Sequence, residues 1–421
     1  MFEKIELAQG VTLYVRPTTQ FKTISFSFKF RTALTAQVAA ERTVLTNVLQ
    51  HSNAAYPTTA AYRSALDDLY GAVLYFDTAK KGTTHTLYMN AEIVNDQYLS
   101  HEAVFEPMIE VMKSALFAPN LANGEFKPAI VTREKKIVEE RIEAVFDDKA
   151  RFAQKRLMEI LRPNHPASIS ANGTVAEVNA ITPTSLYAAY QNMLQHDSVD
   201  IYVVGDVDVA SMVATMKEAF PFTARTPVTE QRSTTPQSAE FRYVREQQTM
   251  KQGKLHIGFS TPVRFGDDDF AAMQVFNGIF GGYAHSKLFM NVREKESLAY
   301  YASSAYASHH GLVFVTSGIE AINEEKAFTL IKQQLNGMAK GDISEREMTQ
   351  TKAMLKNQLR EALDSARGQI EVYDQYKDLK EPFTVEAWSQ KWQNVTVQEV
   401  AKMAQQMQLE AAYFLSGREE A

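Results

Sequence analysis

The two halves of this chain resemble each other, and an internal repeat constrains a fold more firmly than any single helix or strand does. Each half has a segment in which apolar residues alternate with other residues, and this pattern predicts a strand that is buried on one face. The alternating apolar residues are Ile24, Phe26, Phe28 and Phe30 in the first half and Leu255, Ile257 and Phe259 in the second. A helical segment follows each strand, at about residues 42–53 and 270–280.

Both halves also end alike. In the first half, a Thr-Pro pair at residues 182–183 predicts a helix start, and residues 201–204 then predict a strand. In the second half, Thr396 and Glu399 form a capping box that precedes an apolar strand at residues 413–416. Strands and helices grouped in this way, twice over, predict an α+β fold of two homologous units, each a mostly antiparallel sheet covered by helices.

The segment between the halves is typical of a linker. Residues 223–240 are polar, contain Pro227 and Pro236, and show no apolar periodicity. We therefore expect an N-terminal unit at residues 1–222 and a C-terminal unit at residues 241–421.

Three long amphipathic helices are expected within the two halves. They lie at about residues 102–116, 125–161 and 344–376. Ser344 and Glu347 form a capping box at the start of the last one. The charges of residues 133–151 have mixed signs at i, i+4 spacing, which favours a solvated helix face over a binding surface.

Composition excludes several classes of protein. A length of 421 residues suggests two or three domains, and 45% hydrophobic and 22% charged residues are typical of a globular chain rather than a disordered one. A formal net charge of -6, without basic runs interleaved with aromatic residues, argues against nucleic-acid binding. Cysteine is absent, which excludes thiol catalysis, disulfides and thiolate metal sites.

The chain has no evident membrane or export signal. Residues 1–6 have neither the positive region nor the apolar run of a signal peptide, and no uninterrupted apolar stretch is long enough to span a bilayer. We expect a cytoplasmic protein that binds neither membrane nor nucleic acid.

Residues 47–51, Asn-Val-Leu-Gln-His, contain the strongest chemical signal of the first half. An H-x-x-E-H helix carries two histidines that bind zinc and a glutamate that takes a proton from the metal-bound water. Asn47 and Gln50 stand in place of the first histidine and the glutamate, and only His51 remains. Val44, Leu45, Val48 and Leu49 form an apolar stripe on a different face. Taken alone, the pattern also fits an ordinary amphipathic helix.

With the repeat, this motif resembles the insulinase/pitrilysin-type (inverted zincin) metallopeptidases, in particular the two-unit branch that includes mitochondrial processing peptidase and bacterial relatives. The resemblance covers nearly the whole chain. It implies that the third zinc ligand comes from a second helix, which is similar to residues 133–141 here. The ligand position falls on Arg141 by this comparison, and the preceding Glu140 is the alternative.

The second half carries a further match to this family. Gly281 and Gly282 resemble its glycine turn, a short helix follows that ends near Arg293, and Tyr300 closes a Leu-Ala-Tyr strand start. The resemblance implies that these four residues bind substrate, with Arg293 and Tyr300 reaching the zinc site of the other unit. Both side chains can donate to a carbonyl oxygen that gains charge. Without the family context, Arg293 would be read as a solvated charge and Tyr300 as a strand-face aromatic residue.

The substitutions in the zinc motif argue against hydrolysis. Zinc prefers imidazole, thiolate or carboxylate, whereas Asn47 offers a neutral amide oxygen. Gln50 cannot accept a proton, and Arg141 would place a positive charge beside the metal. The remaining histidines lack metal-ligand spacing, and no serine-hydrolase elbow or phosphate-binding loop occurs. We expect no catalytic residue, metal or cofactor in this chain, with degenerate positions at Asn47, Gln50, His51 and Arg141.

A degenerate zinc motif beside a retained Arg293 and Tyr300 resembles the non-catalytic subunits of heterodimeric family members. The resemblance implies a catalytically inactive chain that pairs with a homologous zinc-bearing subunit and grips a peptide or unfolded polypeptide. Zinc is then expected only in the partner. Two alternatives remain: a purely structural assembly protein on the same fold, and an active zinc metallopeptidase with a non-standard site. The sequence leaves the substrate, the identity of the partner and self-association open.

Overall fold

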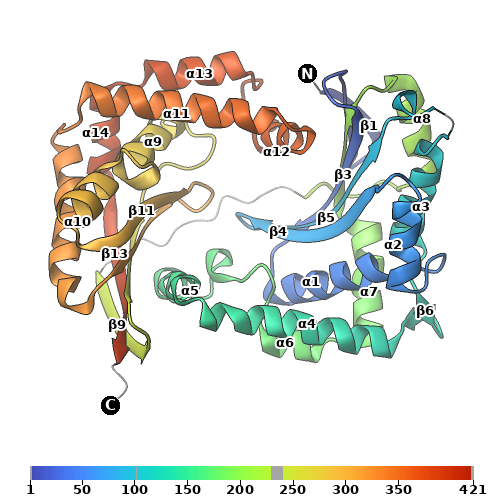
Figure 1. The fold of residues 1–421 in the computed structure, drawn as a ribbon, viewed down its shortest axis with the longest axis horizontal. Helices are drawn as coiled ribbons and strands as arrows, with labels where there is room; N and C mark the ends of the chain where they lie inside the picture. The colour runs from blue at the N-terminus through green and yellow to red at the C-terminus, as the bar shows by residue number, and fades with distance from the viewer. Residues whose placement is uncertain (1, 101, 229–239, 419–421) are drawn as a thin grey trace. The chain divides into compact units, whose positions relative to one another are not determined.

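The computed structural model describes residues 2–100, 102–228 and 240–418. The chain forms two compact α+β units, which confirms the fold class predicted from the repeat (Figure 1). Unit 1 comprises Met1–Ala144, Ile169–Gln231 and Ser365–Tyr373, and unit 2 comprises Val145–Ser168, Arg232–Asp364 and Asp374–Ala421. Each unit therefore includes a segment from the other half of the sequence.

Unit 1 is built on a six-stranded sheet with the order β1-β2-β8-β3-β5-β4. The strands are β1 (Glu3–Ala8), β2 (Val11–Pro17), β3 (Thr23–Ala33), β4 (Val73–Lys81), β5 (Thr84–Val94) and β8 (Ser198–Gly205). Only the β2–β8 pair is parallel among the pairs of this sheet that the structure describes. β4 is an edge strand, and a short hairpin of β6 (Leu121–Ala122) and β7 (Glu125–Phe126) lies apart from the sheet.

The helices of unit 1 bury one face of this sheet. They are α1 (Ala36–His51), α2 (Thr59–Asp67), α3 (Phe105–Phe117), α4 (Pro128–Asp147), α6 (Val175–Ala180), α7 (Pro183–His196) and α8 (Val209–Ala219), with a 3-10 turn η1 (Asp96–Tyr98). Phe26 and Phe28 of β3 lie in one core with Val44, Leu45 and Val48 of α1. The predicted apolar stripe of α1 thus faces the sheet.

Unit 2 is built on a five-stranded sheet with the order β11-β12-β10-β13-β9, in which β13 and β9 are parallel (Figure 1). The strands are β9 (Arg242–Thr249), β10 (Gly253–Ser260), β11 (Ala299–Ala307), β12 (Leu312–Ile319) and β13 (Gln408–Arg418). The helical segments are α5 (Lys149–Leu161), η2 (Pro166–Ser168), α9 (Phe270–Asn277), η3 (Gly278–Gly282), η4 (Leu288–Lys295), η5 (Ala321–Asn323), α10 (Glu324–Ala339), α11 (Glu345–Leu363), α13 (Val385–Asn394) and α14 (Val397–Gln405). The capping boxes predicted at Ser344 and Thr396 are confirmed.

Two of the three long helices predicted from the sequence are each two helices in the structure. The segment predicted at residues 125–161 divides into α4 and α5, because Asp148 accepts hydrogen bonds from the backbone N–H groups of Ala150 and Arg151 and so starts a new helix. The segment predicted at residues 344–376 divides into α11 and α12 (Ala366–Tyr376). α5 belongs to unit 2, and residues 366–373 of α12 belong to unit 1.

The prediction that the strand at residues 24–30 is buried on one face is wrong, because α12 covers the second face. Ser25, Ser27 and Lys29 on that face of β3 are buried as well. The ammonium of Lys29 lies 3.0 Å from the Glu371 carboxylate of α12 and 5.1 Å from the centre of the Tyr202 ring. A buried charge needs such partners.

The prediction of a strand that is buried on one face is also wrong for β10. Its alternate residue His256 is only 1% exposed, because α5 covers that face of the sheet. Phe152 and Leu157 of α5 pack in one cluster with Tyr413 of β13. Both faces of each sheet are therefore occupied, one by helices of the same half and the other by a helical segment from the opposite half.

The described part of the predicted linker is anchored to unit 1 at Arg225 and at Val228, whose backbone N–H donates to the Ser198 Oγ over 3.2 Å. Arg225 is 6% exposed and donates to the carbonyl oxygens of Leu194 and Asp197. Residues 229–239 of that linker lie outside the described residues, so the boundary at residues 223–240 stays a prediction. Within the described ranges, no helix combines the length and the apolar character that crossing a membrane requires.

Candidate functional site

Residues 47–51, which the sequence comparison interprets as a degenerate zinc motif, lie on the C-terminal turns of α1. Thr35 caps the start of this helix by accepting from the Val38 N–H. Asn47, Gln50 and His51 are half-buried, in contrast to the fully buried apolar stripe. These three side chains therefore lie at the edge of the buried face of α1, on the face that the sequence predicts.

Arg141 of α4 reaches Asn47 of α1. Its Nη2 donates to the Asn47 Oδ1 over 3.4 Å, at the long end of hydrogen-bond distances. Glu140 is exposed and its carboxylate lies 3.9 Å from the Lys136 ammonium. Of the two candidate positions for the third ligand, it is thus Arg141 whose side chain makes a hydrogen bond to the motif.

Gln50 is held by the sheet. Its Oε1 accepts a hydrogen bond of 3.3 Å from the backbone N–H of Phe76, which belongs to the edge strand β4. The amide oxygen at the position of a general base is therefore engaged with the backbone. An amide also has no lone pair basic enough to take a proton from water at neutral pH.

The side chains at the motif do not fit a zinc ion. Asn47 and Gln50 provide neutral amides, Arg141 provides a cation, and His51 provides the one imidazole of the set. Among the residues that the structure describes, no group of three or more His, Cys, Asp and Glu is arranged to hold a metal. We derive no reaction step through a metal in this chain.

Arg293 of unit 2 lies in the π-helical segment η4. Its guanidinium is 4.5 Å from the centre of the Phe289 ring and 3.7 Å from the Glu294 carboxylate, and its side chain is 40% exposed. The stacking on Phe289 limits the rotamers of a side chain that still reaches solvent. Ser297, with a φ of 51°, then turns the chain toward β11.

Tyr300 is the extra residue of a β-bulge. Ala299 pairs with Ile319 and Tyr301 pairs with the adjacent Gly318, so Tyr300 has no partner in the β11–β12 ladder. Its side chain is 63% exposed. η4 packs against β11, so Arg293 and Tyr300 come from neighbouring elements. A bulge redirects a side chain from the regular alternation of a strand.

Gly281 and Gly282 belong to the π-helical segment η3. A Cβ at Gly281 would lie 2.5 Å from the backbone nitrogen of Ser304 in β11, and a Cβ at Gly282 would lie 3.0 Å from the carbonyl oxygen of Asn277. Close backbone approach accounts for glycine at residue 281. The substrate-binding role of both residues stays a prediction.

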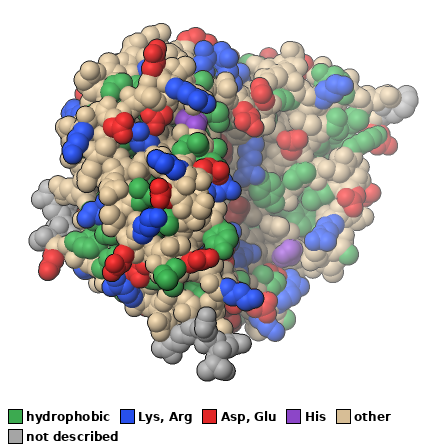
Figure 2. Space-filling view, turned by 60° about the vertical axis from the view of Figure 1, so that its left-hand side comes forward, with side chains coloured by type: hydrophobic (Ala, Val, Ile, Leu, Met, Phe, Trp, Pro, Cys, Tyr) green, Lys and Arg blue, Asp and Glu red, His purple; other side chains and the backbone are tan. Residues whose placement is uncertain are grey.

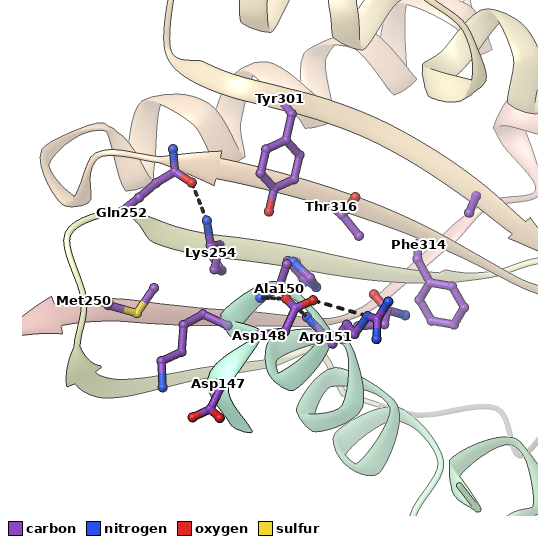
Figure 3. Close-up of a pocket in the computed structure, with 14 residues that line it drawn as sticks. Asp147, Asp148, Ala150, Arg151, Met250, Gln252, Lys254, Tyr301, Phe314 and Thr316 are labelled. Carbon is purple, nitrogen blue, oxygen red and sulfur yellow. Dashed lines mark hydrogen bonds and ion pairs between the residues drawn. The ribbon is translucent and has the colours of Figure 1, made fainter. Parts of the chain in front are cut away.

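Sequence reasoning missed a cavity in unit 2. It has a volume of about 820 Å³ and lies beside the first turn of α5, with Lys254, His256 and Tyr301 in its lining (Figure 3). Lys254 and His256 occupy the strand face that the alternation left to solvent, so the pattern hid them. Two polar residues at i, i+2 on a strand are too common a signal to indicate a site.

Charged side chains of both signs are mixed on the molecular surface. On the face in Figure 2, Lys and Arg side chains alternate with Asp and Glu side chains, and no patch of one sign dominates the described residues there.

Comparisons with known proteins identify the family of the chain and agree with the fold. The family model for the peptidase M16 inactive domain matches residues 180–355. A probable inactive metalloprotease of Bacillus subtilis, YmfF, is 38% identical over 411 residues, which are 97% of this chain and 96% of that protein. The chain belongs to the peptidase M16 family, which confirms the resemblance to the insulinase/pitrilysin-type peptidases.

Two solved structures are similar over their whole length. A conserved protein from Enterococcus faecalis V583 has a TM-score of 0.92 and 36% sequence identity, and the match covers 100% of this chain and 99% of that chain. A peptidase M16 inactive domain from Pseudomonas fluorescens has a TM-score of 0.79 and 17% identity, covering 99% and 98%. The second likeness concerns the fold alone.

Proposed function

We propose that this chain is a catalytically inactive peptidase homologue that pairs with a zinc-bearing homologue and contributes Arg293 and Tyr300 to the binding of a peptide or unfolded polypeptide. The observation that carries the proposal is the contrast between two motifs. Asn47 at the zinc position accepts from a cation, Arg141, whereas Arg293 and Tyr300 remain solvent-accessible on irregular backbone.

The surroundings of Asn47 and Gln50 support an inactive site. A guanidinium beside Asn47 repels a divalent cation, and the Gln50 amide is bound to the backbone of β4. Restoring hydrolysis would need a change at every one of these positions. Zinc is accordingly expected in the partner subunit and not in this chain.

The geometry of the second motif supports a binding role. π-helical segments and β-bulges are uncommon and concentrate at functional sites, because a regular element would bury or redirect the side chain. A guanidinium and a phenol are both donors, and they are suited to a carbonyl oxygen that gains charge during peptide hydrolysis at the partner's zinc. The family resemblance implies that the substrate is an extended polypeptide. The expected location of the protein remains the cytoplasm.

The test uses this chain together with an H-x-x-E-H homologue from the same organism. Co-purification should yield a complex that hydrolyses a quenched fluorescent peptide, while the isolated chain should be inactive. Arg293→Ala should lower turnover of the complex by about 100- to 1,000-fold, since an oxyanion donor is lost. Tyr300→Phe should have a smaller effect, because it removes one neutral hydroxyl.

Matched controls separate a binding role from folding. Arg360→Ala and Tyr98→Phe alter exposed residues outside the motif and should leave turnover unchanged. Gel filtration should show the same complex for all variants. Full activity in both motif variants, with assembly intact, would favour the purely structural alternative. Hydrolysis by the isolated chain with one bound zinc would favour the active-peptidase alternative.

A further inference from the structure

Unit 2 contains a cavity that the predicted Arg293 and Tyr300 site does not use. It lies between the first turn of α5 and the face of the sheet formed by β10, β11 and β12 (Figure 3). Its volume of about 820 Å³ is in the range of pockets that bind small molecules.

Three side chains that line this cavity carry polar atoms without a partner among the described residues. They are both ring nitrogens of His256, the hydroxyl of Tyr301 and the Oε1 of Gln154. His256 is 1% exposed, and burial lowers its pKa to about 3. The neutral ring therefore offers one donor and one acceptor. Buried polar groups are almost always hydrogen-bonded, so these atoms need partners from the cavity, which water molecules or a ligand with polar atoms can supply.

One end of the cavity combines a cation with a phenol. Burial lowers the pKa of Lys254, whose ammonium donates to the Gln252 side chain and lies 5.4 Å from the centre of the Tyr301 ring. The Tyr301 hydroxyl points into the space between Lys254 and Thr316 (Figure 3). Burial raises the pKa of Tyr301, so this hydroxyl keeps its proton and can donate. A ligand atom placed here meets donors from both side chains.

The remaining lining limits the size of the ligand's charge. Met250, Ala305 and Phe314 provide apolar surface, with Met250 and Phe314 at opposite ends of the view in Figure 3. Asp147 and Asp148 stand at the first turn of α5. Asp148 is engaged by the helix cap and by Arg151, whose Nε lies 3.2 Å from it. Lys149 and Arg151 line the cavity as well, so its three cations, with Lys254, exceed its two carboxylates by one charge, which favours a singly charged anion over a phosphate monoester.

We propose that this cavity binds a small organic acid, with its carboxylate against Lys254 and Tyr301 and its apolar body against Ala305 and Phe314. A carboxylate matches one ammonium in charge and accepts from both donors. His256 and Gln154 then serve further polar atoms of the ligand. The site is formed within unit 2, so the proposal does not rest on pairing with another subunit.

Calorimetry on the full chain tests directly whether the carboxylate of the ligand contributes to binding. The probe is 3-phenylpropionate, and its neutral amide, 3-phenylpropionamide, is the matched control. The acid should bind at least about tenfold more tightly than the amide, because only the acid forms charge-assisted hydrogen bonds. A second pair, Ala-Ala-Phe with a free or an amidated C-terminus, distinguishes a small acid from the end of a peptide chain. Binding of either acid above its amide supports the proposal and assigns the source.

Substitutions locate the binding. Lys254→Met keeps an unbranched side chain and should weaken binding of the preferred acid at least about tenfold, and Tyr301→Phe should weaken it less. Lys251→Met changes an exposed lysine three residues earlier and should leave binding unchanged. Equal binding of acid and amide, undiminished binding by a folded Lys254→Met variant, or no binding of either acid would overturn the proposal.

Discussion

The Nη2 of Arg141 lies 3.4 Å from the Oδ1 of Asn47, so a cation from α4 lies beside the helix position that carries the first histidine in an intact zinc motif. The two side chains are complementary to each other and unsuited to a metal, because the amide oxygen is a neutral acceptor and the guanidinium is a cation. The pair therefore supports the proposal that this chain holds no zinc between α1 and α4.

The first prediction is that the isolated chain binds no stoichiometric zinc. Asn47 and Gln50 provide weak donors, and Arg141 opposes a cation. The measurement is elemental analysis after dialysis against trace zinc. About one tightly held zinc per chain would contradict it and would point to ligands elsewhere.

The second prediction is that zinc affinity returns when all three positions are restored. Asn47→His, Gln50→Glu and Arg141→Glu together should create a measurable zinc site, because two histidines and a carboxylate then come from α1 and α4. The double variant Asn47→His with Gln50→Glu is the control. It should stay without zinc while Arg141 remains, whereas binding by the double variant would assign the third ligand to Glu140.

Part of the fold is predictable from the sequence because the repeat shows two strands and two helices in each half. The capping boxes at Ser344 and Thr396 and the strand at β8 lie where local patterns place them. The position of α5 and α12 is not predictable in this way. Both continue an amphipathic pattern without interruption, and the covering of a sheet by a segment from the other half is a long-range packing relation.

The residues of the candidate sites also divide into those that the sequence predicts and those that it does not. Motif spacing identifies Asn47 and Gln50, the family resemblance identifies Arg293 and Tyr300, and the structure adds that Tyr300 is a bulge residue. The cavity around His256 could not be found from the sequence. Its lining residues come from two distant parts of the chain, at residues 147–154 and 250–316, and none of them belongs to a motif. A strand pattern reports which face is apolar, and it does not report that a distant helix covers the other face.

The third prediction concerns limited proteolysis of the predicted linker. Trypsin should cut first after Arg232, within the polar residues 223–240, and not after Arg225, because the Arg225 side chain is buried and bonded to the carbonyl oxygens of Leu194 and Asp197. Mass spectrometry of the first fragments is the measurement. Initial cleavage inside β8 or β10 would refute the boundary between the units.

The fourth prediction is a pH dependence of stability from His85. Burial and the nearby Arg42 lower the pKa of His85 to about 4, against 6.5 for the free side chain. Between these values the unfolded chain binds a proton that the folded chain does not, so stability falls as the pH falls through this window. From pH 6.5 to pH 5 the loss should be about 1–2 kcal/mol.

Urea unfolding at several pH values measures this loss. His85→Gln retains an N–H donor for the Ala171 carbonyl oxygen, which accepts from His85 Nε2 over 3.1 Å, and should show a correspondingly smaller loss between pH 6.5 and pH 5. His196→Gln alters an exposed histidine and should lose as much stability as the parent chain. An unchanged pH dependence in the His85→Gln variant would show that other groups control acid stability.

The last prediction concerns the ion pair between Arg162, which follows α5, and Glu410 of β13. Both side chains are 2% exposed, and Glu410 is the extra residue where β13 shifts register against β10. Glu410→Gln should destabilise the chain by about 3–5 kcal/mol, because a buried guanidinium loses its counter-ion. Arg162→Met with Glu410→Leu should recover most of that loss, since apolar side chains of similar size replace a desolvated pair.

The exposed pair Lys113 and Glu110 provides the control for this experiment. Its side chains are 45% and 67% exposed, so Glu110→Gln should change the free energy of unfolding by less than about 1 kcal/mol. Chemical unfolding of the three variants and the parent chain gives the comparison. If Glu410→Gln costs no more than Glu110→Gln, the pair does not hold α5 on the sheet, and the apolar contacts of Phe152 and Leu157 alone would account for the packing of that helix.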